Sequence, residues 1–421
     1  MKNLSKVTAL ALLISLSGSV VSTSVFAAPN YEEIEKRKNA KTKVMSERTG
    51  KKVMKAFEFV DAEDFNGAIA VLKELDPSDE FDRATIDRYL GQLYAQVDNY
   101  QLAIKYTQDA IKPDELNFND QEQAMKLLGD LLANIKKYKE AKQAYIDWMD
   151  FTGEEDPTVY TRIAQASYEL GQFKDVVEPA ERAIELNAKK EPKKAPFQLL
   201  MAAHYEAKEF DKAVKILERM VKTWPTDGKA WVNLGKFYMQ VEDYEKGLTT
   251  MDIAYDSGFF ESETDYKVLA QLYSFVGVPY KAGFHMEKAI TDGKVKRIKQ
   301  NVTAMASYFH NAKNIKTAAK YYEEAAEFDN DAELFRKAGA LRLQEEQFDK
   351  AVVLLKRALD EGSDKKGTIY SDLAEAYLQQ EKYKQAYAAI TKAAEDPSTR
   401  KFARSWKTFI KDKAQRNGVS L

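Results

Sequence analysis

The sequence predicts an all-α fold in which about ten helix–turn–helix units stack into a right-handed superhelical solenoid with a C-terminal capping helix. The first observation is a small residue that recurs about every 35 residues along the chain. The second is the weakness of strand signals, because no run of alternating β-branched residues appears and the 421 residues include only 18 Gly and 10 Pro. The third is a charged fraction of 31%, which suits many solvent-exposed helix faces.

The ladder of small residues marks the middle of the first helix of each unit. Its members are Ala56, Gly91, Gly129, Ala164, Met201, Gly235, Ala270, Ala306, Gly339 and Ala374. A Gly or Ala on the facing sides of two antiparallel helices lets their axes approach to the lower end of the usual range of about 8–10 Å. An ordinary amphipathic bundle would share the helical period of 3.6 residues, but it would not keep these positions in register.

The clearest copy resembles the tetratricopeptide repeat (TPR). It reads Trp231-x-x-Leu234-Gly235-x-x-Tyr238, and Tyr244 opens its second helix. The TPR is a helix–turn–helix unit of about 34 residues. The residues that define this unit serve helix packing, so the resemblance implies a binding scaffold and not an enzyme. A solenoid of this kind grows lengthwise, because each unit contacts only its neighbours.

Residues 1–27 are predicted to be a cleavable signal peptide. A short basic start precedes an apolar core at residues 7–16, and Val25-Phe26-Ala27 supplies small residues before the cut. The mature chain is expected to begin at Ala28 and to be periplasmic. An uncleaved membrane anchor is the competing interpretation, but it needs about 20 strongly apolar residues, and the second half of this segment is rich in Ser and Thr.

Three further regions are predicted: a basic N-terminal segment at 28–48, the repeats at 49–397, and a basic capping helix and tail at 398–421. In the last region Phe402, Trp406 and Ile410 form one apolar stripe, expected to lie over the final repeat. The ends carry net charges of +5 (31–55) and +6 (398–421) within a chain of net charge −2. These basic ends could contact an anionic membrane surface or an acidic partner, or could simply favour solubility. Nucleic acid is an implausible partner for an exported acidic protein.

The composition gives no support for catalysis or for metal and cofactor binding. There is no Cys, which excludes disulfides and thiolate metal sites. The three histidines, His204, His285 and His310, lack the spacing of metal ligands. Phosphate-binding loops, nucleophile elbows and zinc-protease motifs are missing as well. We therefore expect no catalytic residue, no metal ligand and no cofactor.

A partner is expected on the concave face, which the first helices of a TPR solenoid line. Positions of the repeat frame that packing does not use should face outward there. They are Arg88, Gln92, Lys126, Asp130, Gln165, Tyr168, Gln198, Tyr205, Lys236, Met239, Lys267 and Gln271. This mixture of cations, amides and aromatic or thioether groups predicts a groove that binds protein.

The overall layout resembles a narrower group. The chain combines a predicted signal peptide, the segment Arg48-Thr49-Gly50-Lys51-Lys52-Val53, about ten TPR units and a basic terminal helix containing Trp. This layout is similar to that of exported TPR proteins of marine gamma-proteobacteria encoded beside TonB–ExbB–ExbD systems. The resemblance implies an accessory role in TonB-dependent uptake across the outer membrane, typically of iron chelates, with TonB-system components as possible partners. A scaffold for envelope-polymer export or outer-membrane protein assembly is the alternative.

Overall fold

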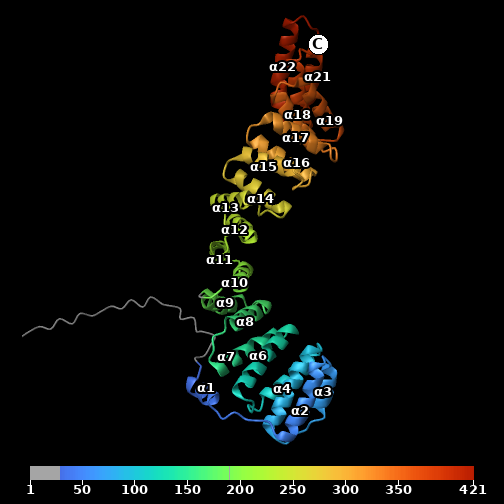
Figure 1. The fold of residues 1–421 in the computed structure, drawn as a ribbon. Coiled ribbons are helices and arrows are strands. Elements are labelled where there is room, and N and C mark those ends of the chain that lie inside the picture. Colours follow the sequence, from blue (N-terminus) through green and yellow to red (C-terminus); the bar gives the residue numbers. More distant parts are fainter. Residues whose placement is uncertain (1–28, 189) are drawn as a thin grey trace, which may run out of the picture. The chain divides into compact units, whose positions relative to one another are not determined.

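The computed structural model describes residues 29–188 and 190–421, and these form 22 α-helices and no strand (Figure 1). The predicted signal peptide, residues 1–27, lies outside the described residues. Consecutive helices pack against one another within each of two compact units, which divide the described chain after Lys208. The prediction of an all-α repeat solenoid is confirmed.

The first unit contains ten helices. They are α1 (Tyr31–Lys38), α2 (Glu47–Asp61), α3 (Phe65–Lys73), α4 (Glu80–Gln96), α5 (Tyr100–Ile111), α6 (Phe118–Asn134), α7 (Tyr138–Thr152), α8 (Pro157–Glu169), α9 (Phe173–Ala188) and α10 (Lys194–Glu206). The even-numbered helices from α2 onward are the first helices of repeats, and the odd-numbered helices from α3 onward are the second helices.

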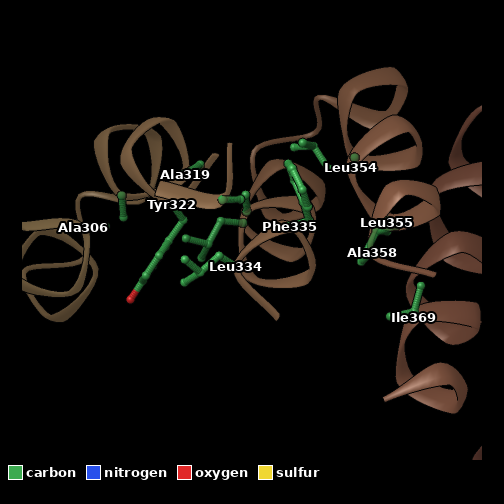
Figure 2. Close-up of a cluster of buried hydrophobic side chains, with 14 of the residues drawn as sticks. Ala306, Ala319, Tyr322, Leu334, Phe335, Leu354, Leu355, Ala358 and Ile369 are labelled. Atoms are coloured by element: carbon green, nitrogen blue, oxygen red, sulfur yellow. The ribbon is translucent and has the colours of Figure 1, made fainter. Parts of the chain in front are cut away.

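The second unit contains twelve helices in the same alternation. They are α11 (Phe210–Thr223), α12 (Gly228–Gln240), α13 (Tyr244–Asp256), α14 (Glu263–Phe275), α15 (Pro279–Thr291), α16 (Lys299–Asn311), α17 (Ile315–Ala326), α18 (Ala332–Gln344), α19 (Phe348–Asp360), α20 (Lys366–Gln379), α21 (Tyr383–Ala393) and α22 (Arg400–Arg416). The core of this unit runs without a break from Ala270 to Ala414. Figure 2 shows part of it, where Phe335 of α18 lies between residues of neighbouring helices.

Close helix approach explains the small residues of the ladder. A Cβ on Gly235 would stand 2.5 Å from Cγ of Met251, which is completely buried. A Cβ on Gly339 would stand 2.8 Å from Cγ of Leu355, also completely buried. In both repeats the larger residue comes from the second helix and fills the space that the glycine leaves open.

Each of the ten repeats turns from its first helix to its second through one residue in the left-handed region. These residues are Glu63, Asp98, Lys136, Gly171, Lys208, Glu242, Gly277, Lys313, Glu346 and Glu381, with φ between 57° and 79°. Each stands seven positions after its ladder residue. The backbone therefore repeats with the same register that the small residues predict.

The residues before α2 form a strap along the edge of the first unit. Lys38 of α1 pairs with Glu154 at 3.8 Å. Asn117 accepts a 2.8 Å hydrogen bond from the backbone N–H of Lys43 and returns one of 3.1 Å to its carbonyl. Ser46 donates to Asp82 at 2.5 Å. This N-terminal strap, residues 31–46, thus contacts α4, the α5–α6 turn and the α7–α8 turn.

The terminal helix α22 packs through a stripe that differs from the expected one. Ala403, Ile410 and Ala414 are completely buried, whereas Phe402 is 49% exposed and Trp406 is partly buried. Small residues suit this position because α22 lies close to α21. The expectation is therefore met at Ile410 and is wrong at Phe402.

Candidate partner-binding face

The twelve residues predicted to line a groove fall into both units. Eight lie on α4, α6, α8 and α10 of the first unit, and four lie on α12 and α14 of the second. The structure brings neighbours together within each unit. Their exposure and contacts decide which of them are available to a partner.

Arg88 does not face outward as the repeat frame predicts. It is only 8% exposed, and its guanidinium lies 3.1 Å from Asp120 of α6 and over the ring of Tyr89. The carboxylate and the aromatic ring compensate the charge of this buried side chain. Arg88 therefore joins two successive first helices and is not free for a partner.

Two of the predicted lysines make the same kind of bridge. Lys126 of α6 lies 2.9 Å from Asp156, the N-cap of α8. Lys236 of α12 lies 2.7 Å from Asp265 in the first turn of α14. The fourth predicted cation, Lys267, pairs with Glu263 on its own helix. All four cations of the predicted groove are therefore neutralised within the chain.

The bridging carboxylates are held in their ionised form. Burial alone would raise the pKa of Asp265, but hydrogen bonds from Lys236 and from Ser262 outweigh it and hold the pKa below its usual value of 3.8. Burial likewise opposes ionisation of Asp156, and hydrogen bonds from Lys126 and from the backbone of Thr158 lower its pKa. These pairs are consequently fixed structural links near neutral pH.

An aromatic hollow of about 530 Å³ lies between the first two repeats. Its lining includes Phe57 of α2, with Tyr89 and Gln92 of α4. The ring of Phe57 stands edge-on to that of Tyr89 at 5.0 Å, and Phe57 is 40% exposed. Of these three residues, sequence reasoning identified only Gln92. The hollow offers an apolar site with an amide at its rim.

A polar hollow of about 550 Å³ lies between the third and fourth repeats. Its lining includes Asp130 and Asn134 of α6, Arg162 and Gln165 of α8, and Tyr138. Asp130 accepts a 2.6 Å hydrogen bond from Tyr145 and lies 3.8 Å from Arg162. The predicted Asp130 and Gln165 thus share one site. Its mixed donors and acceptors can bind amide or peptide groups.

Helix α6 contributes to both hollows. Leu127 lines the aromatic hollow, and Asp130, three residues later, lines the polar hollow. Residues three apart are neighbours on one helix face. The same spacing separates Tyr89 from Gln92 and Arg162 from Gln165, so each of these helices presents a pair of residues to the hollows.

The missed residues could have been found from the repeat frame. Phe57 directly follows the ladder residue of the first copy, as Gln92, Asp130 and Gln165 follow theirs. The predicted set begins with the second copy and therefore does not include it. Tyr89 and Arg162 stand two positions before the ladder residue, a position from which none of the predicted groove residues was taken.

The other predicted residues lie outside these two hollows. Tyr205 is 49% exposed, Gln198 and Gln271 are exposed, and Tyr168 and Met239 are partly buried. The ring of Tyr168 lies 5.7 Å from that of Phe173. These residues are surface positions of first helices, and the structure assigns them no shared site.

Among residues 29–188 and 190–421, no group of three or more His, Asp or Glu side chains could hold a metal ion. None of the helices in this part of the chain is both long enough and apolar enough to cross a membrane.

Comparison with known proteins gives two matches to family models. Residues 195–254 and residues 342–398 each match a model described as tetratricopeptide repeat. Neither model describes an enzyme. A comparison with curated protein sequences gives no match.

Solved structures with similar folds are also TPR proteins. A tetratricopeptide repeat protein from Parabacteroides merdae is 14% identical, with 79% of this chain and 99% of that chain covered and a TM-score of 0.36. YrrB, a TPR protein with an unusual peptide-binding site, is 17% identical over 49% of this chain and 99% of that chain, with a TM-score of 0.36. The TPR2AB domain of yeast Sti1, solved as a pHSP90 complex, is 13% identical over 64% of this chain and 99% of that chain, with a TM-score of 0.35.

The two family matches fall on repeats whose helices, ladder residues and left-handed turns keep the register of the whole described chain. TPR units are typically non-catalytic and bind proteins. Residues 195–254 and 342–398 are therefore tetratricopeptide repeats, a kind of unit that typically mediates protein–protein interaction.

Proposed function

We propose that the first helices of the first four repeats hold a segment of a partner protein. The observation that carries this proposal is the pair of hollows that share α6, one aromatic and one polar. An apolar side chain of the partner would enter the aromatic hollow and pack against Phe57 and Tyr89. Its backbone or a polar side chain would meet Asp130, Arg162 and Gln165. Aromatic and Arg side chains are the types that most often dominate binding energy at protein interfaces.

The ion pairs favour this part of the face over the predicted lysines. Lys126, Lys236 and Lys267 already have carboxylate partners, so a partner protein would have to compete for them. The aromatic hollow has no such competitor, because Phe57 is 40% exposed and contacts Tyr89 through its edge. We therefore assign the main anchor to the aromatic hollow.

Photo-crosslinking in cells tests the proposed face. A photoreactive amino acid at Gln92, on the rim of the aromatic hollow, is expected to capture a partner. The same substitution at Gln108, an exposed glutamine on the second helix α5, is the matched control. The double variant Phe57→Ala, Tyr89→Ala should abolish capture at Gln92 while leaving the helix content unchanged. Equal capture at Gln92 and Gln108 would contradict the proposal.

We further propose a periplasmic location and an accessory role in TonB-dependent uptake. The location is supported by the signal-peptide pattern of residues 1–27, and the role by the resemblance of the layout to exported TPR proteins. Intact mass of protein from the periplasm should begin at Ala28. Protein that retains Met1 in a membrane fraction would favour the anchor interpretation instead.

Growth assays test the uptake role separately. Deletion of the gene should slow growth on chelated iron and spare growth on iron-replete medium, and the crosslinked partner should be a TonB-system component. Equal impairment in both media would contradict this role. Capture of an envelope-polymer or outer-membrane assembly protein would then support the alternative.

A further inference from the structure

The C-terminal helix α22 exposes a continuous aromatic face. Phe402 and Phe409 are 49% and 52% exposed, and Trp406 lies between them. The ring centroids are 5.3 Å apart from Phe402 to Trp406 and 6.2 Å apart from Trp406 to Phe409. The spacing of four and then three residues places all three rings on one side of the helix.

Packing of α22 against the repeats uses mainly a different stripe of the helix, to which only Trp406 of the three rings adds a partly buried contact. Ala403, Ile410 and Ala414 are completely buried and make the packing stripe. Single exposed apolar residues are ordinary, but three contiguous rings on one helix form a patch of the kind that marks an interaction surface. Phe402 and Phe409 are thus exposed beside the packing stripe, and Trp406 lies between the exposed and the buried side of the helix.

The same helix carries a dense and unpaired positive charge. Its 17 residues include seven Lys or Arg and one Asp. Among the described residues, no carboxylate forms an ion pair with any of these cations, which are Arg400, Lys401, Arg404, Lys407, Lys411, Lys413 and Arg416. The basic residues before α3 differ, because Lys36, Arg37, Lys38, Lys43 and Lys51 all pair with carboxylates of the chain. The C-terminal helix therefore differs from the N-terminal end, where ion pairs within the chain use five of the nine cations between residues 31 and 55.

We propose that α22 binds an anionic phospholipid surface and lies along it without crossing. Phe402, Trp406 and Phe409 would enter the region between headgroups and acyl chains, where aromatic rings are favoured. Lys413 and Arg416 continue the aromatic side of the helix by one and two turns, so their long side chains can reach the phosphate groups.

The charge pattern of α22 favours an anionic bilayer over two other binding partners, a second copy of the chain and an acidic protein surface. A second copy of the chain would place two α22 helices of net charge +6 face to face, which is unfavourable. An acidic protein surface would satisfy the cations, whereas an anionic bilayer satisfies both the cations and the three rings. The bilayer is therefore the occupant that uses every feature of the helix.

Vesicle flotation of the purified protein tests the proposal. Vesicles of equal parts phosphatidylethanolamine and phosphatidylglycerol should carry the protein upward, and vesicles of phosphatidylcholine should carry much less. The triple variant Lys401→Gln, Lys413→Gln, Arg416→Gln should lower partitioning on the order of 100-fold, since each cation near an anionic surface contributes about fivefold. The double variant Phe402→Ser, Phe409→Ser should lower it about tenfold or more.

Matched controls remove similar groups elsewhere. The triple variant Lys41→Gln, Arg48→Gln, Lys52→Gln takes three unpaired cations from the N-terminal end. The double variant Phe275→Ser, Phe284→Ser takes two aromatic residues that are 57% and 48% exposed on other helices. Both controls should float like the parent protein.

Trp fluorescence adds a readout at the helix itself. Binding to the anionic vesicles should shift the emission to shorter wavelength, and Trp406→Phe should remove most of that shift. Flotation that survives both α22 variants would overturn the proposal. Failure of the parent protein to bind anionic vesicles would also overturn it and leave an acidic protein surface as the complement of α22. Neither result bears on crosslinking at Gln92, so the two proposals can fail independently.

Discussion

Tyr145 packs against Gly129 in the third repeat so closely that a Cβ on the glycine would stand 2.6 Å from Cε1 of the ring. The ring has no room to move aside, because Tyr145 is 1% exposed and its hydroxyl donates a 2.6 Å hydrogen bond to Asp130. This contact joins the helix-packing ladder to the polar hollow.

Gly129→Ala should therefore lower the free energy of unfolding by about 1–3 kcal/mol, the usual cost of overpacking. Urea unfolding followed by circular dichroism measures the change. Gly50→Ala is the matched control, because Gly50 lies inside α2 with no atom within 4 Å of its would-be Cβ. That change should raise stability by about 0.5–1 kcal/mol. Equal effects at the two glycines would refute the close packing of Tyr145.

Gly277→Ala should lower the free energy of unfolding by about 1–2 kcal/mol for a purely backbone reason. Its φ is +79°, and nothing lies within 4 Å of a Cβ built there. Contact strain is therefore excluded as a cause. The urea midpoint of this variant, compared with that of Gly50→Ala, measures the cost of the left-handed turn, and a midpoint at or above the parent value would contradict this account.

Asp265→Asn should weaken the second unit by on the order of 2–3 kcal/mol, since it leaves Lys236 without its carboxylate. Asp265 is 3% exposed and also accepts a 2.8 Å hydrogen bond from the backbone N–H of Ser262. Because the pKa of Asp265 is lowered, its contribution is present above the usual value of 3.8 and is lost as the pH falls below it.

The measurement is urea unfolding of parent and variant at neutral and acid pH, where the difference should shrink on acidification. Asp292→Asn serves as the control, because Asp292 caps the C-terminal end of α15 and its pair with Lys288 of the same helix is half exposed. That variant should unfold like the parent. A neutral result for Asp265→Asn would mean that the bridge between α12 and α14 is not stabilising.

Asp372→Asn should stabilise the protein at neutral pH. Burial raises the pKa of Asp372 from 3.8 to about 6, with nearby Glu375 adding to the shift and Arg336 opposing it. A raised pKa means that the carboxyl group contributes stability below its unfolded value of 3.8 and loses it as the pH rises through about 6. Near neutral pH, the free energy of unfolding of the variant should exceed that of the parent protein by up to about 3 kcal/mol.

Urea unfolding as a function of pH checks this, and the advantage of Asp372→Asn should vanish near the usual Asp pKa of 3.8. Asp349→Asn is a suitable comparison, because the side chain of Asp349 is 92% exposed. A constant difference across the pH range would show that the effect of Asp372 is not due to ionisation.

The fold could be predicted because helix packing selects particular residues at fixed positions. Gly129 and Gly235 are required by the rings and thioethers that face them, and such requirements appear directly in the sequence. The left-handed turns could not be predicted in the same way. Eight of the ten hold a residue other than glycine, such as Lys136 or Glu346. Packing of the two helices therefore imposes a left-handed conformation that the residue type at the turn does not predict.

The candidate site could be predicted only in part. Gln92, Asp130 and Gln165 follow from the repeat frame, because outward positions keep the same spacing. The burial of Arg88 depends on Asp120, 32 residues further along, and no local pattern reveals that partner. The pairing of the basic N-terminal segment with acidic turns depends on contacts still further apart in sequence.

The N-terminal strap has a consequence for how the first unit unfolds. Each repeat of a solenoid contacts only its neighbours, so the end units ordinarily unfold first and separately from the rest. The strap joins Ser46 to Asp82, Lys43 to Asn117 and Lys38 to Glu154, contacts 36, 74 and 116 residues apart in sequence. Opening any of α2 to α7 therefore breaks contacts that belong to the others. The amides of these helices should exchange with solvent as one cooperative block, where a linear array would fray inward from its end.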